Sequence, residues 1–165
     1  MTGQTSKRGP AKSGKSGRST ARLLAVQAVY QMELAGIGAD RALGEFIQHR
    51  LDAPGEEGET FAPADRSVFV AVVGGVARDR ATLDEAIAGA LDPSWTIDRL
   101  ETVLLAILRC GVFELRSRPE VPTGTVINEY IDIAHAFYGG KEPALVNAVL
   151  DRIARVLRSE DGSAA

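Results

Sequence analysis

Residues 97–116 read IDRLETVLLAILRCGVFELR, and apolar side chains would surround almost the whole of a helix formed by this stretch. A helix that is apolar nearly all round belongs in the interior of a protein. We therefore expect a central helix that other helices cover. Asp92 and Pro93 interrupt the chain before this stretch, and Pro119 and Pro122 indicate a turn after it.

Apolar residues at helical spacing continue on both sides of this central stretch. The spacing predicts five further helices, at about 19–36, 40–51, 64–91, 125–138 and 143–158. The run VFVAVVGGV at 68–76 would also suit a buried strand. The length of its segment and the periodic continuation past Gly75 favour a helix, in which Gly74 and Gly75 mark a kink or a close contact. The expected fold class is all-α, a bundle of six to seven helices.

The same spacing predicts which helix faces are buried. The stripe expected in the first helix is Leu23, Val26, Tyr30 and Leu34, and the one in the second is Leu43, Phe46, Ile47 and Leu51. Asn128 and Asn147 are polar residues in otherwise apolar helices, and a buried amide must be hydrogen-bonded. We expect each of these asparagines to bond a neighbouring helix end.

The chain has 165 residues, 45% of them hydrophobic and 25% charged, which is typical of one globular domain with short tails. Its single cysteine excludes a disulfide framework. No apolar run approaches the roughly 20 residues that span a bilayer, and the N-terminus lacks the apolar stretch of a signal peptide. These features predict a cytoplasmic protein that is not bound to a membrane.

The charge is distributed unevenly along the chain. Residues 1–22 contain six basic and no acidic side chains, whereas the other 143 residues contain 13 basic and 22 acidic ones. The sequence predicts a disordered basic arm at 1–18, a helical domain at 19–158 and a flexible tail at 159–165. A basic arm on an acidic body indicates a polyanionic partner such as nucleic acid, although a solubilising tail fits the composition equally well.

The sequence lacks the patterns of the common catalytic and metal sites. His49 and His135 have no second ligand at a suitable spacing, and Cys110, inside the most apolar helix, is expected to be a buried structural thiol. Phosphate-binding glycine loops and a GxSxG elbow are missing. The helical acids are interpreted as separate solvated groups; they are Glu101, Glu114, Glu129 and Asp132. We expect no enzyme, no metal and no cofactor.

Four segments carry a resemblance to a known family. They are ARLLAVQAVYQMEL at 21–34, AILRCGVFELRSRPEVP at 106–122, VINEYIDIAHAFY at 126–138 and ALVNAVLDRIAR at 144–155. In this order, after a basic arm, they resemble the NusB family of bacterial transcription antitermination factors over about residues 18–158. The resemblance implies an all-α fold of two packed helical subdomains and a role without catalysis.

The resemblance also implies partners. Together with NusE, a small-subunit ribosomal protein, the protein would bind single-stranded boxA RNA in nascent ribosomal RNA leader transcripts and help RNA polymerase avoid premature termination. Two alternatives are a NusB-like accessory domain related to RNA cytosine methyltransferases and a plain helical interaction module. A homodimer is left open.

Seven residues are the expected RNA contacts, from the resemblance together with their chemistry. They are Lys15, Arg18, Arg22, Gln27, Tyr30, Phe137 and Lys141. Single-stranded RNA is held by cations on its phosphates and by aromatic or amide side chains on its bases. Residues 22, 26 and 30 share a helix face, so Arg22 and Tyr30 are expected to point the same way. Without the family, Tyr30 would be read as a core aromatic residue.

The chain departs from the family pattern at three places, one of which is its basic arm, longer and more widely spaced by Gly and Ser than the family's short arginine cluster. Leu104 and Leu105 stand where many members carry a charged pair, so the contact with NusE predicted there would be an apolar patch. Leu145 stands where the usual Phe-Val-Asn-Gly motif has its aromatic residue, and its presence removes one candidate for stacking on a base.

Overall fold

The computed structural model describes residues 16–51 and 63–159, and within these ranges the chain forms helices and no strand. The helices are α1 (Gly17–Ala35), α2 (Ala39–His49), α3 (Arg66–Ala90), the short 3-10 helix η1 (Ile97–Arg99), α4 (Thr102–Ser117), α5 (Thr123–Phe137) and α6 (Glu142–Ser159). The all-α prediction is confirmed. Most of the predicted arm at 1–18 and most of the predicted tail at 159–165 lie outside the described residues.

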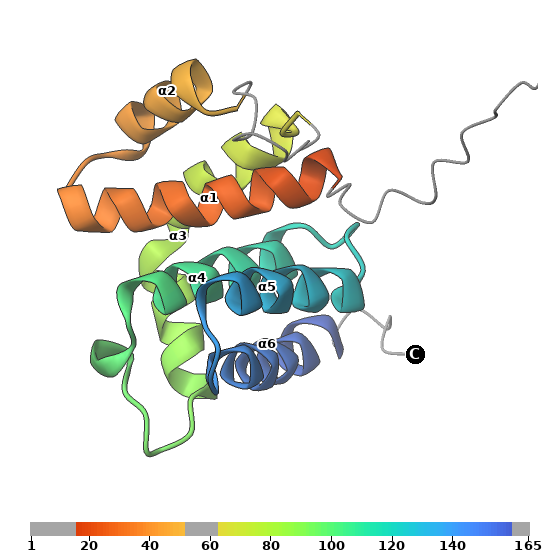
Figure 1. Ribbon diagram of the computed structural model, residues 1–165. Helices are drawn as coiled ribbons and strands as arrows, with labels where there is room; N and C mark the ends of the chain where they lie inside the picture. The colour runs from red at the N-terminus through yellow and green to blue at the C-terminus, as the bar shows by residue number, and fades with distance from the viewer. Residues whose placement is uncertain (1–15, 52–62, 160–165) are drawn as a thin grey trace, which may run out of the picture.

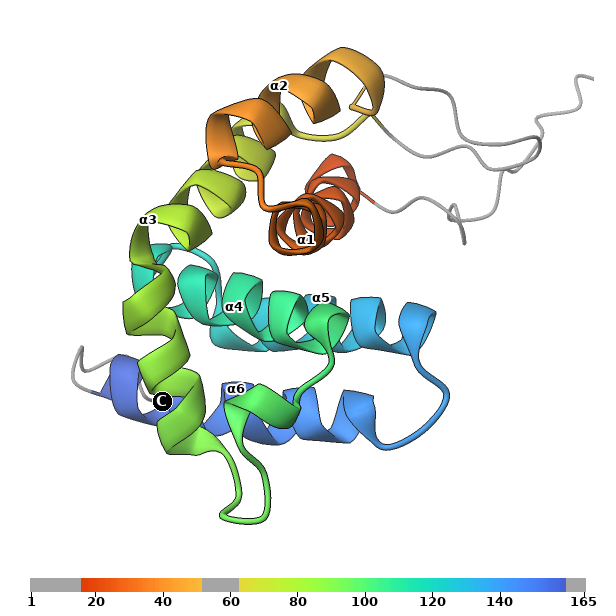
Figure 2. The same cartoon turned by 90° about the vertical axis from the view of Figure 1, so that its left-hand side faces the viewer.

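The helices form two packed groups. α1 and α2 lie on one side of the molecule and α4, α5 and α6 on the other, while α3 runs alongside both groups (Figures 1 and 2). α4 lies between α1 and α6 (Figure 2). One continuous hydrophobic core joins all six α-helices. This arrangement agrees with the two helical subdomains expected.

α4 is the central helix that the sequence predicts. Eleven of its sixteen residues are buried. Cys110 is fully buried there, and burial raises the pKa of its thiol, as expected of a structural cysteine rather than a nucleophile. Arg109 of the same helix donates two hydrogen bonds to Asp84 of α3, at 2.7 and 2.9 Å, and lies 3.7 Å from Glu33 of α1. These pairs connect α1, α3 and α4.

α3 settles the choice between strand and helix in favour of the helix. It begins after Asp65, whose carboxylate accepts a hydrogen bond from the backbone N–H of Val68 at 3.2 Å. The helix continues through Gly74 and Gly75 to Ala90. Gly75 is the close contact that the sequence suggests: it is buried, and a Cβ atom there would overlap the ring of Phe113 in α4. Around Gly74 there is open space.

Gly75→Ala is expected to lower the free energy of unfolding by about 1–3 kcal/mol, because the added methyl group forces the Phe113 ring or a helix to shift. Gly74→Ala is the matched control. It adds the same methyl group one residue away, into open space, and is expected to be neutral or to stabilise the helix by up to about 1 kcal/mol. Urea denaturation of both variants measures the difference. Equal changes in the free energy of unfolding would contradict the close contact between Gly75 and Phe113.

Two predictions of burial are wrong, one for Leu34 and one for the asparagines Asn128 and Asn147. Leu34, expected on the buried stripe of α1, is 65% exposed, because the buried face of this helix is formed mainly by its small residues, such as Ala21 and Ala25. Asn128 and Asn147 are exposed rather than bonded inside the core, since α5 and α6 turn other residues inward. Within the described ranges, no helix is long and apolar enough to cross a membrane.

Candidate functional site

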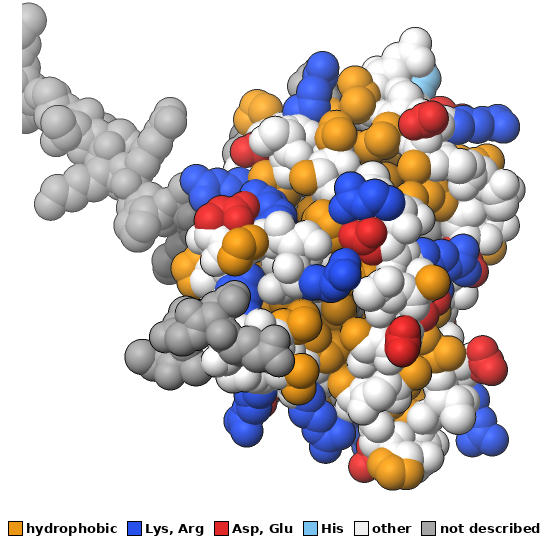
Figure 3. All heavy atoms as spheres, turned by 180° about the vertical axis from the view of Figure 1, so that it is seen from behind, with side chains coloured by type: hydrophobic (Ala, Val, Ile, Leu, Met, Phe, Trp, Pro, Cys, Tyr) orange, Lys and Arg blue, Asp and Glu red, His pale blue; other side chains and the backbone are white. Residues whose placement is uncertain are grey.

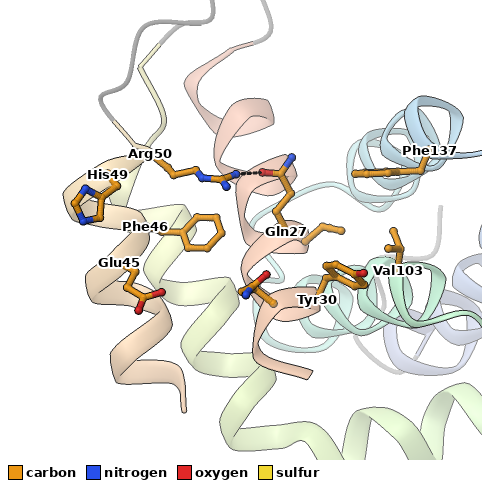
Figure 4. A pocket seen from close by; sticks show the side chains of 10 residues that line it. Gln27, Tyr30, Glu45, Phe46, His49, Arg50, Val103 and Phe137 are labelled. Atoms are coloured by element: carbon orange, nitrogen blue, oxygen red, sulfur yellow. Dashed lines mark hydrogen bonds between the residues drawn. The ribbon is translucent and has the colours of Figure 1, made fainter. Parts of the chain in front are cut away.

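A groove of about 710 Å³ lies among four helices. α1 and α2 supply most of its lining, while the start of α4 and the end of α5 contribute one residue each (Figure 4). The residues of the lining that matter below are Gln27, Tyr30, Phe46, Arg50, Val103 and Phe137.

Three of the predicted RNA contacts meet in this groove. Gln27 and Tyr30 come from α1, and Phe137 comes from the last turn of α5, more than 100 residues later in the chain. Tyr30 is half-buried, whereas Phe137 leaves 43% of its surface exposed. Figure 4 shows both aromatic rings on the same part of the groove, with Val103 between their helices. An exposed ring beside a phenol and an amide can accept a flat apolar ligand with a polar edge.

The side of the groove formed by α2 and Arg50 contains none of the RNA contacts predicted from the sequence. Phe46 is buried and stacks on Phe69 of α3, with 5.7 Å between ring centroids. The guanidinium carbon of Arg50 lies 5.3 Å from the Phe46 ring centroid. Arg50 Nη1 also donates to Gln27 Oε1 at 3.4 Å, the dashed contact in Figure 4. The sequence indicates that Phe46 faces inward. The apolar pattern of α2 does not predict, however, where the C-terminal end of this helix lies relative to α1.

Arg22 is not at the groove, which corrects its assignment as an RNA contact. Its residue is 2% exposed, and its Nε and Nη2 donate to the two carboxylate oxygens of Glu114 at 2.8 and 3.0 Å. At Arg22 and Val26 the helix face that was expected to contact RNA packs into the core. Arg22 therefore joins α1 to α4 instead of reaching solvent.

Glu114 is the centre of a buried polar cluster, not the solvated acid expected. Besides Arg22, the phenol of Tyr130 and Nη1 of Arg118 donate hydrogen bonds to its carboxylate. Burial and the neighbouring Glu114 charge raise the pKa of Tyr130 well above its usual value, so the phenol stays a donor. Burial alone would lower the pKa of Arg22, but the Glu114 hydrogen bond and charge outweigh it and raise that pKa.

The two leucines predicted to contact NusE differ in exposure. Leu104 is 3% exposed and packs in the core, so it cannot form a partner surface in this conformation; this corrects its assignment. α4 is nearly apolar all round, and position 104 faces its neighbours rather than solvent. Leu105 is half-buried, so part of its side chain is accessible to a partner.

The predicted phosphate contacts that the structure describes do not line the groove. Arg18 is exposed in the first turn of α1, and Lys141 is exposed in the connection between α5 and α6, four residues after Phe137. Lys15 lies outside the described residues. The hydroxyl of Ser19 donates to Glu129 Oε1 at 2.8 Å, which fastens the start of α1 to α5 beside Arg18.

Comparison with known proteins identifies the family. The model of the NusB family matches residues 19–155. The transcription antitermination protein NusB of Sinorhizobium fredii is 50% identical over 145 residues, covering 87% of this chain and 89% of the relative. That of Rhizobium rhizogenes is 46% identical over 162 residues, covering 97% and 98%. The chain belongs to the NusB family.

Solved structures of NusB share the fold. T. maritima NusB matches with a TM-score of 0.69 and 25% identity, over 86% of this chain and 92% of that chain. The antitermination factors NusB and NusE in complex with dsRNA provide a second match, with a TM-score of 0.70 and 24% identity over 85% and 97% of the two chains. As a member of the NusB family, the chain is a transcription antitermination factor and not an enzyme, as the resemblance implies.

The surface of this NusB-family protein mixes charges of both signs. On the face seen from behind, Arg and Lys side chains alternate with Asp, Glu and apolar groups, and no continuous basic strip crosses it (Figure 3). A polyanion would therefore find no extended cationic track on that face. Across the part of the chain that the structure describes, no group of three or more His, Cys, Asp or Glu residues could hold a metal ion.

Proposed function

We propose that this NusB-family protein binds an unpaired RNA strand in the groove between α1, α2 and α5. The observation that carries the proposal is the convergence of Tyr30 and Phe137, with the Gln27 amide, on one open groove. Every nucleobase has a flat face that stacks on an aromatic ring, and the stacked face is accessible only when the base is unpaired. Arg18, exposed in the first turn of α1, and Lys141, exposed four residues after Phe137, would hold phosphates beyond the stacked bases.

The RNA in this proposal is the boxA element of ribosomal RNA leader transcripts, and NusE is the second protein that holds it. A solved structure of NusB and NusE in complex with dsRNA shares this fold, which supports NusE and RNA as partners. Because both proteins would contact one strand, neither need bind it tightly alone. The complex would act in the cytoplasm on RNA polymerase, suppressing premature termination. Leu105, half-buried at the start of α4, is the remaining sequence-based candidate for the NusE contact.

The proposal is tested by measuring the affinity for a boxA oligonucleotide and for a scrambled one, with and without NusE. We expect the boxA oligonucleotide to bind more tightly, and the difference to grow when NusE is present. Equal affinity for the two oligonucleotides under both conditions would defeat the sequence-specific proposal.

Removing residues 1–15 is expected to weaken the salt dependence of RNA binding. The truncation deletes four basic side chains, Lys7, Arg8, Lys12 and Lys15. At about 0.7 per neutralised phosphate of a single strand, the slope of log K against log salt should become shallower by at most about 3. Titrations between low and physiological salt measure the slope. An unchanged slope and affinity would show that the basic segment is not part of the RNA site.

A further inference from the structure

Arg50 is held in place by two contacts of different kinds. Its guanidinium lies over the Phe46 ring, and it donates a hydrogen bond to Gln27 Oε1 across the groove. The Phe46 ring is itself fixed by stacking on Phe69. An exposed arginine would otherwise sample many rotamers. Here the ring and the amide together restrict it to the groove wall (Figure 4).

The Arg50 contact decides which end of the Gln27 amide faces a ligand. A guanidinium can only donate hydrogen bonds, so the amide must present its oxygen to Arg50. The Gln27 NH₂ group is then the end that remains for a ligand. Arg50 lines the groove together with Gln27, and its guanidinium has further N–H groups besides the one that Gln27 accepts. This part of the groove thus offers adjacent donors.

We propose that Arg50 positions Gln27 so that the groove selects an unpaired base with two adjacent hydrogen-bond acceptors. The inference rests on the proposed function, since it assumes that RNA occupies the groove. Guanine offers N7 and O6 side by side, and cytosine offers N3 and O2. On its Watson–Crick and Hoogsteen edges, adenine places an amino donor beside each acceptor, so it would leave one groove donor facing another donor. The groove would therefore reject adenine, and uracil, whose N3–H donor lies between O2 and O4, also lacks two adjacent acceptors.

Four other side chains that line the groove can accept a hydrogen bond. The Glu45 carboxylate already accepts from Arg41 Nε at 3.2 Å, and Tyr30 presents its ring beside Val103 (Figure 4). Gln31, four residues after Gln27 in α1, and His49 form no hydrogen bond with Gln27 or Arg50 among the described residues. None of the four therefore competes with Arg50 for the orientation of the Gln27 amide.

The test uses the full chain with NusE and nine-nucleotide oligouridines that carry one central G, C, A or U. We expect the best of the G and C oligonucleotides to bind about tenfold more tightly than the A oligonucleotide. Two base analogues show whether guanine or cytosine is the bound base. If it is guanine, an oligonucleotide with 7-deazaguanine, which lacks N7, should bind no more tightly than the A oligonucleotide. If it is cytosine, an oligonucleotide with 2-pyrimidinone, which keeps N3 and O2, should still bind more tightly than the A oligonucleotide.

Arg50→Met keeps an apolar stem against Phe46 but removes the donor that orients Gln27. We expect it to reduce the preference over adenine to about twofold, and Gln27→Glu, which replaces the NH₂ donor by an acceptor, to abolish it. Arg41→Met is the control for charge, because it removes one exposed charge from α2, the helix that ends just before Arg50, and Arg41 does not line the groove. It also frees the Glu45 carboxylate, whose negative charge repels the phosphates of all four oligonucleotides alike. It should weaken all four oligonucleotides equally.

Three results would overturn the inference. If Arg50→Met weakens all oligonucleotides by the same factor as Arg41→Met and leaves the preference intact, Arg50 serves only as a charge. If the wild-type protein binds the four oligonucleotides equally, the groove does not distinguish bases by the hydrogen-bonding groups on their edges, while the proposed function stands. Absence of any RNA binding would overturn the proposed function and this inference together.

Discussion

Glu114→Ala is expected to lower the free energy of unfolding by about 3–5 kcal/mol, the largest effect of a single substitution in the fold. The carboxylate is fully buried and accepts hydrogen bonds from Arg22, Tyr130 and Arg118. Its removal leaves the Arg22 guanidinium in the core without its main counter-charge, and burying an unpaired charge is far more costly than losing an exposed ion pair. Urea denaturation followed by circular dichroism measures the change.

Glu120→Ala is the matched control for this prediction. Glu120 also pairs with Arg118, at 3.3 Å, but its side chain is 65% exposed. Exposed pairs contribute at most about 1 kcal/mol, so the control variant should be nearly as stable as the wild type. A Glu114 variant that loses no more stability than the Glu120 variant would contradict the account of the buried cluster.

Phe137→Ala is expected to weaken RNA binding by about 5- to 150-fold, which corresponds to the roughly 1–3 kcal/mol of one base stacked on an aromatic ring. The side chain is 43% exposed at the end of α5, so its loss should barely change stability. Fluorescence anisotropy with a labelled boxA oligonucleotide measures the affinity.

Trp95→Ala provides the comparison for Phe137. Trp95 is an aromatic residue of nearly equal exposure, 44%, in the segment between α3 and η1, and it does not line the groove. Its removal should leave the affinity for RNA alone unchanged. Equal losses from the two variants would mean that stacking in the groove does not explain the binding.

Much of the fold could be predicted because burial leaves a periodic pattern. The apolar surface of residues 97–116 predicts the central helix α4. The glycine pair predicts a kink or a close contact, and the structure shows the close contact, between Gly75 and Phe113. The errors concern rotation about the helix axis. In α1 the small alanines, rather than Leu34, face the core, because small residues allow the close approach of a neighbouring helix.

The groove could be predicted only in part. The family resemblance identified Gln27, Tyr30 and Phe137, which the fold brings together, but it also led to Arg22, which the fold buries. An arginine near a basic arm has the same sequence signature whether it faces a phosphate or a buried glutamate. Arg50 was missed because its role depends on the placement of α2 over α1. That placement follows from tertiary packing and not from local periodicity.

The most direct test of the RNA groove is photo-cross-linking of a boxA oligonucleotide containing 4-thiouridine, in the presence of NusE, with the attachment sites mapped by mass spectrometry. We expect cross-links at Tyr30 and Phe137, which lie together at the groove. Cross-links confined to another face, such as the segment that carries Trp95, would contradict the central claim.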